Sequence, residues 1–293
     1  MIRCLAIALL LIGNHGYGRD LNAELTRVMT GRSGAAIVVD VASGHWLAGY
    51  HSEAAARSLA RPGSAFKPFT LLALLQSGKL GATEPFVCRR TLHVGTHNLS
   101  CTHPQTGPLQ ASSALAYSCN DFFATLGSRL SATELREAFQ NAGFASPTGF
   151  LPQEAVGSIR LARSDEERKL QAVGEGDMRI TPLEMLAAYR SLALRRAAPH
   201  HSIAEETVFS GLEQATLYGG ARLASIPEMK VAGKTGTPQA DEGSWTNGWF
   251  AGYAPADKPE IVIVVFLERG TGPADAAPLA GEIFRAWYKA GKR

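Results

Sequence analysis

The pattern of apolar and polar positions predicts strands at both ends of the chain and helices in its middle. Residues 35–41 are apolar and β-branched, which predicts a strand, and a Ser-Gly turn leads into a second strand over residues 45–50. Further strands are predicted over residues 228–237, 248–253 and 261–267. These five segments predict one antiparallel sheet made from the first hairpin and the last three strands.

Helical spacing of apolar residues occupies much of the remaining chain. It predicts helices over residues 20–30, 64–76, 111–130, 183–194 and 274–289. Ser131, with Glu134 three positions later, predicts a capped start for one more helix, whereas residues 81–108 show little periodicity and predict a loop. The expected fold is therefore α+β: a five-stranded antiparallel sheet flanked by the terminal helices, with a helical lobe inserted in the middle. A cleft between sheet and lobe would suit a substrate.

Composition narrows the class of protein only slightly. The 293 residues are 45% apolar and 19% charged, which is an ordinary globular balance. The net charge of +3 gives no support for a nucleic-acid partner.

The first residues have the features of an export signal. Arg3 precedes an apolar run over residues 4–12, and small residues follow it. We expect residues 1–18 to be a signal peptide, with a short uncleaved membrane anchor as the alternative, and residues 19–293 to form the domain. The protein is then expected in the periplasm or at the outer face of the cytoplasmic membrane.

Three cysteines lie beyond that segment. Cys88 and Cys101 flank a loop rich in His, Thr and Asn, and in an oxidising compartment they are candidates for a disulfide. The alternative is a zinc site built from the loop histidines His93, His97 and His103. The spacing of these histidines matches no standard zinc pattern. We interpret Cys119 as a small packed residue.

Two short motifs on predicted helices supply candidate groups for acyl transfer. They are Ser64-Ala-Phe-Lys67 and Ser118-Cys-Asn120. Positions i and i+3 share a helix face, so a neutral Lys67 amine would be placed to take the proton of Ser64. The Ser118 hydroxyl can relay a proton, and the Asn120 amide can bond both a substrate carbonyl and Lys67.

The third motif, Lys234-Thr-Gly-Thr237, lies on a predicted strand. Lys234 offers a positive charge, Thr235 and Thr237 offer hydroxyls for a carboxylate, and Gly236 suggests close approach of a ligand. A backbone N–H of this strand and that of Ser64 would form an oxyanion hole. Each motif alone is more simply a chance arrangement. All three in this order indicate acyl transfer through a serine ester.

The chain resembles the transpeptidase domain of class B penicillin-binding proteins from about residue 35 to its C-terminus. Beyond the motifs, the resemblance is carried by IVVDVASGHWLA, RPGSAFKPFT, ALAYSCNDFF, GDMRITPLEMLAAY, KTGTPQ and WFAGYAPADKPEIVIVVFLE. It implies an acylated Ser64, Lys67 as base, Ser118 as proton relay and Asn120 as substrate-orienting group. It implies that a D-Ala-D-Ala stem peptide or a β-lactam would be held by Lys234, Thr235, Gly236 and Thr237. No metal or organic cofactor is implied.

Departures from the family keep other functions open. Class B proteins usually carry a large N-terminal module, whereas the first predicted strand here begins near Ala35, so we expect the usual dimerisation or scaffold surface to be missing. Glu175 stands where the family commonly has Gln.

The leading hypothesis is a D,D-transpeptidase or D,D-carboxypeptidase acting on peptidoglycan stem peptides, with other cell-wall synthesis proteins and the membrane as further expected partners. One alternative is a serine β-lactamase, which is disfavoured because no Glu-x-x-Leu-Asn stretch is present and Asn120 stands where class D enzymes usually have Val. The other is a non-enzymatic β-lactam sensor or cell-wall interaction protein.

Overall fold

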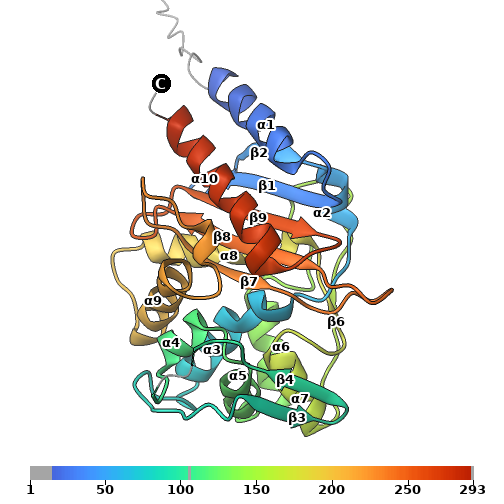
Figure 1. Cartoon of the computed structure of the whole chain (residues 1–293), viewed down its shortest axis with the longest axis vertical. Helices are drawn as coiled ribbons and strands as arrows, with labels where there is room; N and C mark the ends of the chain where they lie inside the picture. The colour runs from blue at the N-terminus through green and yellow to red at the C-terminus, as the bar shows by residue number, and fades with distance from the viewer. Residues whose placement is uncertain (1–14, 105–106, 292–293) are drawn as a thin grey trace, which may run out of the picture.

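The computed structural model describes residues 15–104 and 107–291 (Figure 1). Residues 1–14, which make up most of the predicted export segment, lie outside the described residues. Among the described helices, none combines the length and apolar character needed to span a bilayer.

The predicted sheet is confirmed. Its five antiparallel strands lie in the order β2-β1-β9-β8-β7, so the first hairpin pairs with the last strand. The strands are β1 (Gly34–Asp40), β2 (Trp46–Tyr50), β7 (Ala232–Gly236), β8 (Gly248–Ala254) and β9 (Ile261–Leu267). Strands β8 and β9 are buried along their whole length, which explains their continuous apolar sequence.

Helices cover both faces of this sheet, as predicted. The terminal helices α1 (His15–Met29) and α10 (Ala277–Ala290) lie against each other over one face, and α8 (Pro182–Ala197) packs on the other (Figure 1). Side chains of β1 alternate between the two layers: Ile37 joins the core on the α8 side and Val38 the core under α1 and α10.

The middle of the chain forms a lobe beyond β7 (Figure 1). Its elements are η1 (Gly63–Phe66), α3 (Lys67–Gln76), α4 (Ala111–Ala116), α5 (Asn120–Gly127), α6 (Ala132–Asn141), α7 (Asp165–Ala172) and a hairpin of β3 (Thr91–Val94) and β4 (His97–Ser100). The remaining elements are α2 (Ser52–Arg57), β5 (Ser158–Ile159), β6 (Met178–Arg179), α9 (Ile203–Leu217), η2 (Arg222–Ala224) and η3 (Gly272–Ala276).

Several predicted elements need correction. The predicted helix over residues 111–130 is broken into α4 and α5, because Ser118 has φ +57°, a left-handed conformation that cannot continue a helix. The predicted loop 81–108 contains the hairpin β3–β4, and of the predicted strand 228–237 only residues 232–236 form a strand of the sheet. Helices α7 and α9 were missed.

Candidate active site

Ser64 lies in η1, a short 3₁₀ turn, and α3 begins at Lys67. The prediction of one α-helix from Ser64 is therefore wrong. Lys67 still lies on the same face as Ser64, as expected, because residues i and i+3 eclipse each other in a 3₁₀ turn. Gly63 precedes Ser64 with φ +57°, and a Cβ there would lie 3.1 Å from the backbone nitrogen of Thr237. The Ser64 turn and the end of β7 are therefore in close contact.

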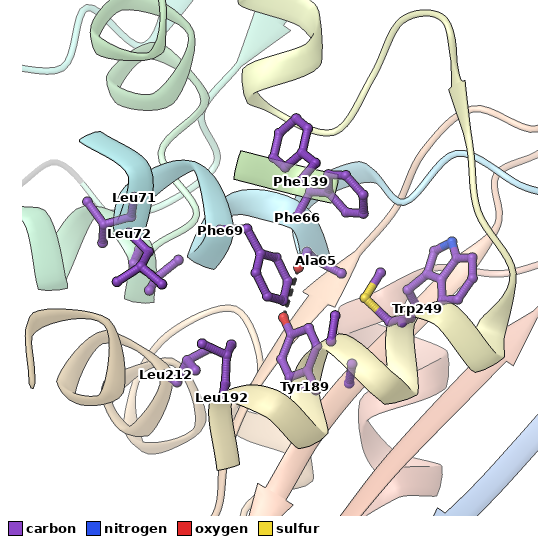
Figure 2. Close-up of a cluster of buried hydrophobic side chains, with 14 of the residues drawn as sticks. Ala65, Phe66, Phe69, Leu71, Leu72, Phe139, Tyr189, Leu192, Leu212 and Trp249 are labelled. Atoms are coloured by element: carbon purple, nitrogen blue, oxygen red, sulfur yellow. Dashed lines mark hydrogen bonds between the residues drawn. The ribbon is translucent and has the colours of Figure 1, made fainter. Parts of the chain in front are cut away.

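Buried aromatic side chains fix the position of the Ser64 turn (Figure 2). The Tyr189 hydroxyl of α8 donates a hydrogen bond to the carbonyl of Ala65 at 2.8 Å. Phe66 packs against Phe139, with ring centroids 4.7 Å apart. The indole N–H of Trp249, on β8, donates to the carbonyl of Arg61 at 2.9 Å. The sheet, α8 and α6 thus hold the turn from three sides, which preorganises the serine.

The first two motifs meet at the Lys67 amine, which is fully buried. Its Nζ donates to the Ser118 carbonyl at 2.8 Å and to Asn120 Oδ1 at 2.5 Å, and it lies 3.1 Å from Ser118 Oγ. The same nitrogen lies 5.4 Å from the centroid of the Phe123 ring. Burial lowers the pKa of Lys67 to about 8, which makes the free amine available near neutral pH.

The turn between α4 and α5 aims Ser118 and Asn120 at Lys67. The left-handed conformation of Ser118 places both its hydroxyl and its carbonyl at the amine. The Asn120 amide nitrogen donates to the Ser100 carbonyl at 2.9 Å, which directs its oxygen toward Lys67. Cys119 caps α5, and its sulfur accepts a hydrogen bond from the backbone N–H of Phe122.

Strand β7 brings the third motif to the same place. A Cβ on Gly236 would lie 2.4 Å from the carbonyl oxygen of Pro62 and 3.2 Å from the amide nitrogen of Ala65, so only glycine permits this contact between β7 and the Ser64 turn. Lys234 is fully buried and donates to the Thr235 carbonyl at 3.2 Å. Burial, and then the nearby charge of Lys67, lowers the pKa of Lys234 well below its usual range.

The two threonines of the third motif differ in their hydrogen bonds. The Thr235 hydroxyl donates to the carbonyl of Gly220 at 3.2 Å, whereas the Thr237 hydroxyl accepts from the backbone N–H of Gly272 at 2.9 Å. Thr237 is exposed and its hydroxyl proton is uncommitted. Thr237 is therefore the better placed donor for a carboxylate.

A glycine loop closes the opposite side of the Ser64 turn. Gly174 accepts a hydrogen bond from the Gly63 amide at 2.9 Å, and a Cβ at position 174 would lie 1.7 Å from the Gly63 carbonyl oxygen. This contact places Glu175 beside the site. Burial raises the pKa of Glu175 to about 7, although the charges of Arg61 and Lys67 act to lower it.

A pocket of about 480 Å³ lies between the lobe and the segments that follow α9 and β9. Tyr117, next to Ser118, lines one side, while Gly220 and Pro273 line the other. Because Thr235 bonds to Gly220, this pocket adjoins the third motif and offers room for part of a substrate.

Four potential metal ligands lie close together in the structure, and the sequence did not predict them as one set. Cys88, Cys101 and Cys119 are free thiols, and His103 joins them. The disulfide predicted between Cys88 and Cys101 is not formed in this structure. Of the three histidines in the alternative zinc site, only His103 lies in this cluster, whereas His93 and His97 are exposed on the hairpin.

All the predicted catalytic and binding residues lie on the Ser64 turn, the Ser118 turn or the end of β7. Roles for Tyr189 and Trp249 were missed, since both act through long-range hydrogen bonds to the backbone of the Ser64 segment. No local pattern in the sequence marks such a contact.

Comparison with known proteins assigns the family. The model of the penicillin binding protein transpeptidase domain matches residues 34–289, and the chain belongs to this family. Stage V sporulation protein D of Bacillus subtilis is 28% identical over 274 residues, covering 76% of this chain and 41% of the relative. Peptidoglycan D,D-transpeptidase MrdA of Acinetobacter baumannii is 27% identical, covering 61% of this chain and 34% of the relative. The chain thus spans less than half the length of these two relatives.

Solved structures show the same fold. The D,D-transpeptidase domain of a peptidoglycan glycosyltransferase from Eggerthella lenta superposes with a TM-score of 0.81 at 23% identity, covering 93% of this chain and 81% of that one. Pseudomonas aeruginosa PBP2 gives a TM-score of 0.80 at 21% identity, covering 92% and 74%. The predicted α+β architecture with an inserted helical lobe is confirmed.

Proposed function

We propose that the protein is a serine D,D-transpeptidase that acts on D-Ala-D-Ala stem peptides of peptidoglycan through an acyl-enzyme on Ser64. One observation carries the proposal: a fully buried Lys67 amine bonded to both Ser118 and Asn120, three residues after a serine held against β7. The names of relatives such as MrdA support the substrate class.

The geometry supports the following acylation step. The neutral Lys67 amine takes the proton of Ser64 as Oγ attacks the carbonyl carbon of the penultimate D-Ala. Negative charge forms on the carbonyl oxygen and is stabilised by the backbone N–H groups of Ser64 and Thr237, each such donor contributing about 3–4 kcal/mol to the transition state. The first N–H groups of a helical turn have no partner within it, so the Ser64 amide is available for this.

Collapse of that intermediate breaks the peptide bond. Ser118 delivers its proton to the departing D-Ala nitrogen and receives the proton that Lys67 took from Ser64, so an ester on Ser64 and a neutral Lys67 remain. An amine of a second stem peptide then attacks the ester, and the proton that this amine loses passes to Ser64 and restores its hydroxyl. Lys234 and Thr237 would hold the terminal carboxylate of the donor peptide. Since stem peptides are cross-linked outside the cytoplasm, we also propose export, with the N-terminal segment as its signal.

Benzylpenicillin tests the proposal, because it mimics the donor and acylates the same serine. Intact-protein mass spectrometry of the wild type is expected to show a long-lived adduct that Ser64→Ala lacks. The wild type is also expected to release D-Ala from a D-Ala-D-Ala peptide when an acceptor amine is supplied. Rapid loss of the adduct with consumed drug would instead identify a β-lactamase. No adduct and no peptide turnover would favour a non-enzymatic role.

A further inference from the structure

Four side chains with metal-ligating atoms converge beside the Ser118 turn. Cys88 and Cys101 lie before and after the hairpin β3–β4, His103 follows two residues later, and Cys119 separates Ser118 from Asn120. One ligand atom from each of the four lies within 4.8 Å of all the others. Three of the residues are buried and Cys88 is half-buried, so the cluster is shielded from bulk water.

The distance between sulfurs fits a shared ion. Cys101 Sγ and Cys119 Sγ lie 3.7 Å apart. A disulfide requires about 2.05 Å. Two thiolates bound to one tetrahedral zinc ion at about 2.3 Å each lie roughly 3.8 Å apart. The observed separation therefore matches the edge of a zinc coordination tetrahedron.

His103 provides independent evidence for a ligand. Its side chain is only 7% exposed, and its Nε2 is a buried atom for which the described residues offer no hydrogen-bond partner. The other ring nitrogen, Nδ1, lies 2.8 Å from the Pro104 carbonyl and 3.2 Å from Nη1 of Arg90. The shorter contact, to the carbonyl, requires a proton on Nδ1, and that tautomer leaves the lone pair of Nε2 available to a metal. A metal would satisfy this otherwise costly buried atom.

Each sulfur also accepts a backbone hydrogen bond. The N–H groups of Arg90, Asp121 and Phe122 donate to Cys88, Cys101 and Cys119 at 3.3, 3.5 and 3.4 Å respectively. The same N–H groups would also bond the sulfurs of a metal site, in which each cysteine is a thiolate.

We propose that Cys88, Cys101, His103 and Cys119 bind one zinc ion in a closed tetrahedral site. Three thiolates and one imidazole fill all four positions, so the ion is structural and leaves no place for substrate. It would join the hairpin β3–β4 to the turn that carries Ser118 and Asn120. The inference replaces the expected absence of a metal, and it does not depend on the proposed function.

The first experiment measures metal content of the full-length protein purified without chelators. About one zinc ion per chain is expected. Cobalt(II) in place of zinc is expected to give the absorption of a tetrahedral thiolate site, and this measurement needs no variant. His103→Ala is expected to lose the ion, whereas His97→Ala, which changes an exposed histidine in the neighbouring hairpin, is the matched control and should keep it.

A second variant distinguishes loss of a zinc ligand from general misfolding. His103→Cys retains a zinc ligand and is expected to recover both bound zinc and thermal stability relative to His103→Ala. The inference is overturned if wild-type protein refilled with zinc under reducing conditions binds none. It is equally overturned if peptide mapping of native protein finds Cys101 in a disulfide. Because metal content is read independently of penicillin binding, failure of this inference and failure of the proposed function are distinguishable.

Discussion

Replacing Gly236 with Ala tests how strictly the end of β7 must contact the Ser64 turn. The new Cβ would lie 2.4 Å from the Pro62 carbonyl oxygen and 3.2 Å from the Ala65 amide nitrogen, both backbone atoms. Contacts below 3.0 Å essentially never occur for a real Cβ, so strand and turn must separate by at least 0.6 Å, the difference between 3.0 and 2.4 Å. Trp249 Cβ lies 3.2 Å from the new Cβ, so a small shift of the methyl group cannot remove the clash.

That separation acts on the proposed oxyanion hole, whose two donors lie on either side of the contact. A misplacement near 1 Å at a reacting centre costs about 100-fold in rate. Overpacking of this kind lowers the free energy of unfolding by about 1–3 kcal/mol. We therefore expect Gly236→Ala to remain folded, with a lowered Tm, while its second-order rate of acylation by benzylpenicillin falls by about two orders of magnitude.

The assay is adduct formation over time by intact-protein mass spectrometry, together with thermal unfolding. Gly220→Ala is the matched control, since its Cβ would meet Thr235 Oγ1 at 3.5 Å and the Ala116 carbonyl oxygen at 4.0 Å, both ordinary contacts in the same region. The reasoning is refuted if Gly236→Ala acylates at the wild-type rate, or if Gly220→Ala is impaired to the same extent.

Four further outcomes are expected. Acylation should rise about tenfold per pH unit below pH 7 and level off above the Lys67 pKa of about 8, because only the free amine is a base. Glu175→Gln should move this rise to lower pH, because the Glu175 carboxylate acts to raise the pKa of Lys67. Thr237→Ala should weaken binding of a carboxylate-bearing β-lactam by roughly 10- to 100-fold, the value of a hydrogen bond to a charge, and Thr235→Ala by less. Asp121→Asn should lower the free energy of unfolding at pH 7 by about 1–2 kcal/mol in urea titrations, because Arg89 is half-exposed and solvent screens the pair.

A specific result would contradict each of these four predictions. A flat pH profile between pH 6 and 8 would exclude Lys67 as the base, and an unshifted profile in Glu175→Gln would exclude its influence. Equal losses in Thr235→Ala and Thr237→Ala would show that both hydroxyls bind the carboxylate.

For Asp121 the sign follows from its pKa. Burial alone would raise the pKa of Asp121, but hydrogen bonds from Arg89 and Thr125 hold it below its usual value. Its contribution is therefore complete above the unfolded pKa near 4 and is lost as pH falls through the folded value. A wild-type advantage over Asp121→Asn that persists unchanged at the lowest pH would contradict this.

Much of the architecture could be predicted from local signals in the sequence. Strands β1 and β9 were predictable from their β-branched, apolar runs, and β8 from its aromatic, apolar run, because such runs suit the buried centre of a sheet. The start of α6 was predictable because Ser131 and Glu134 satisfy its first N–H groups within four residues. A similar box, Ser202 with Glu205, begins α9 and was available as a signal.

The candidate nucleophile, its candidate base and the strand proposed to bind a carboxylate were also predicted from sequence alone, because each motif is short and its residue types are chemically specific. What only the tertiary structure decided were relations between segments far apart in the chain. The broken helix at Ser118, the support of Ala65 by Tyr189 and the meeting of His103 with Cys119 have no local signature. Each depends on where packing brings two backbones together, and that is a property of the whole core.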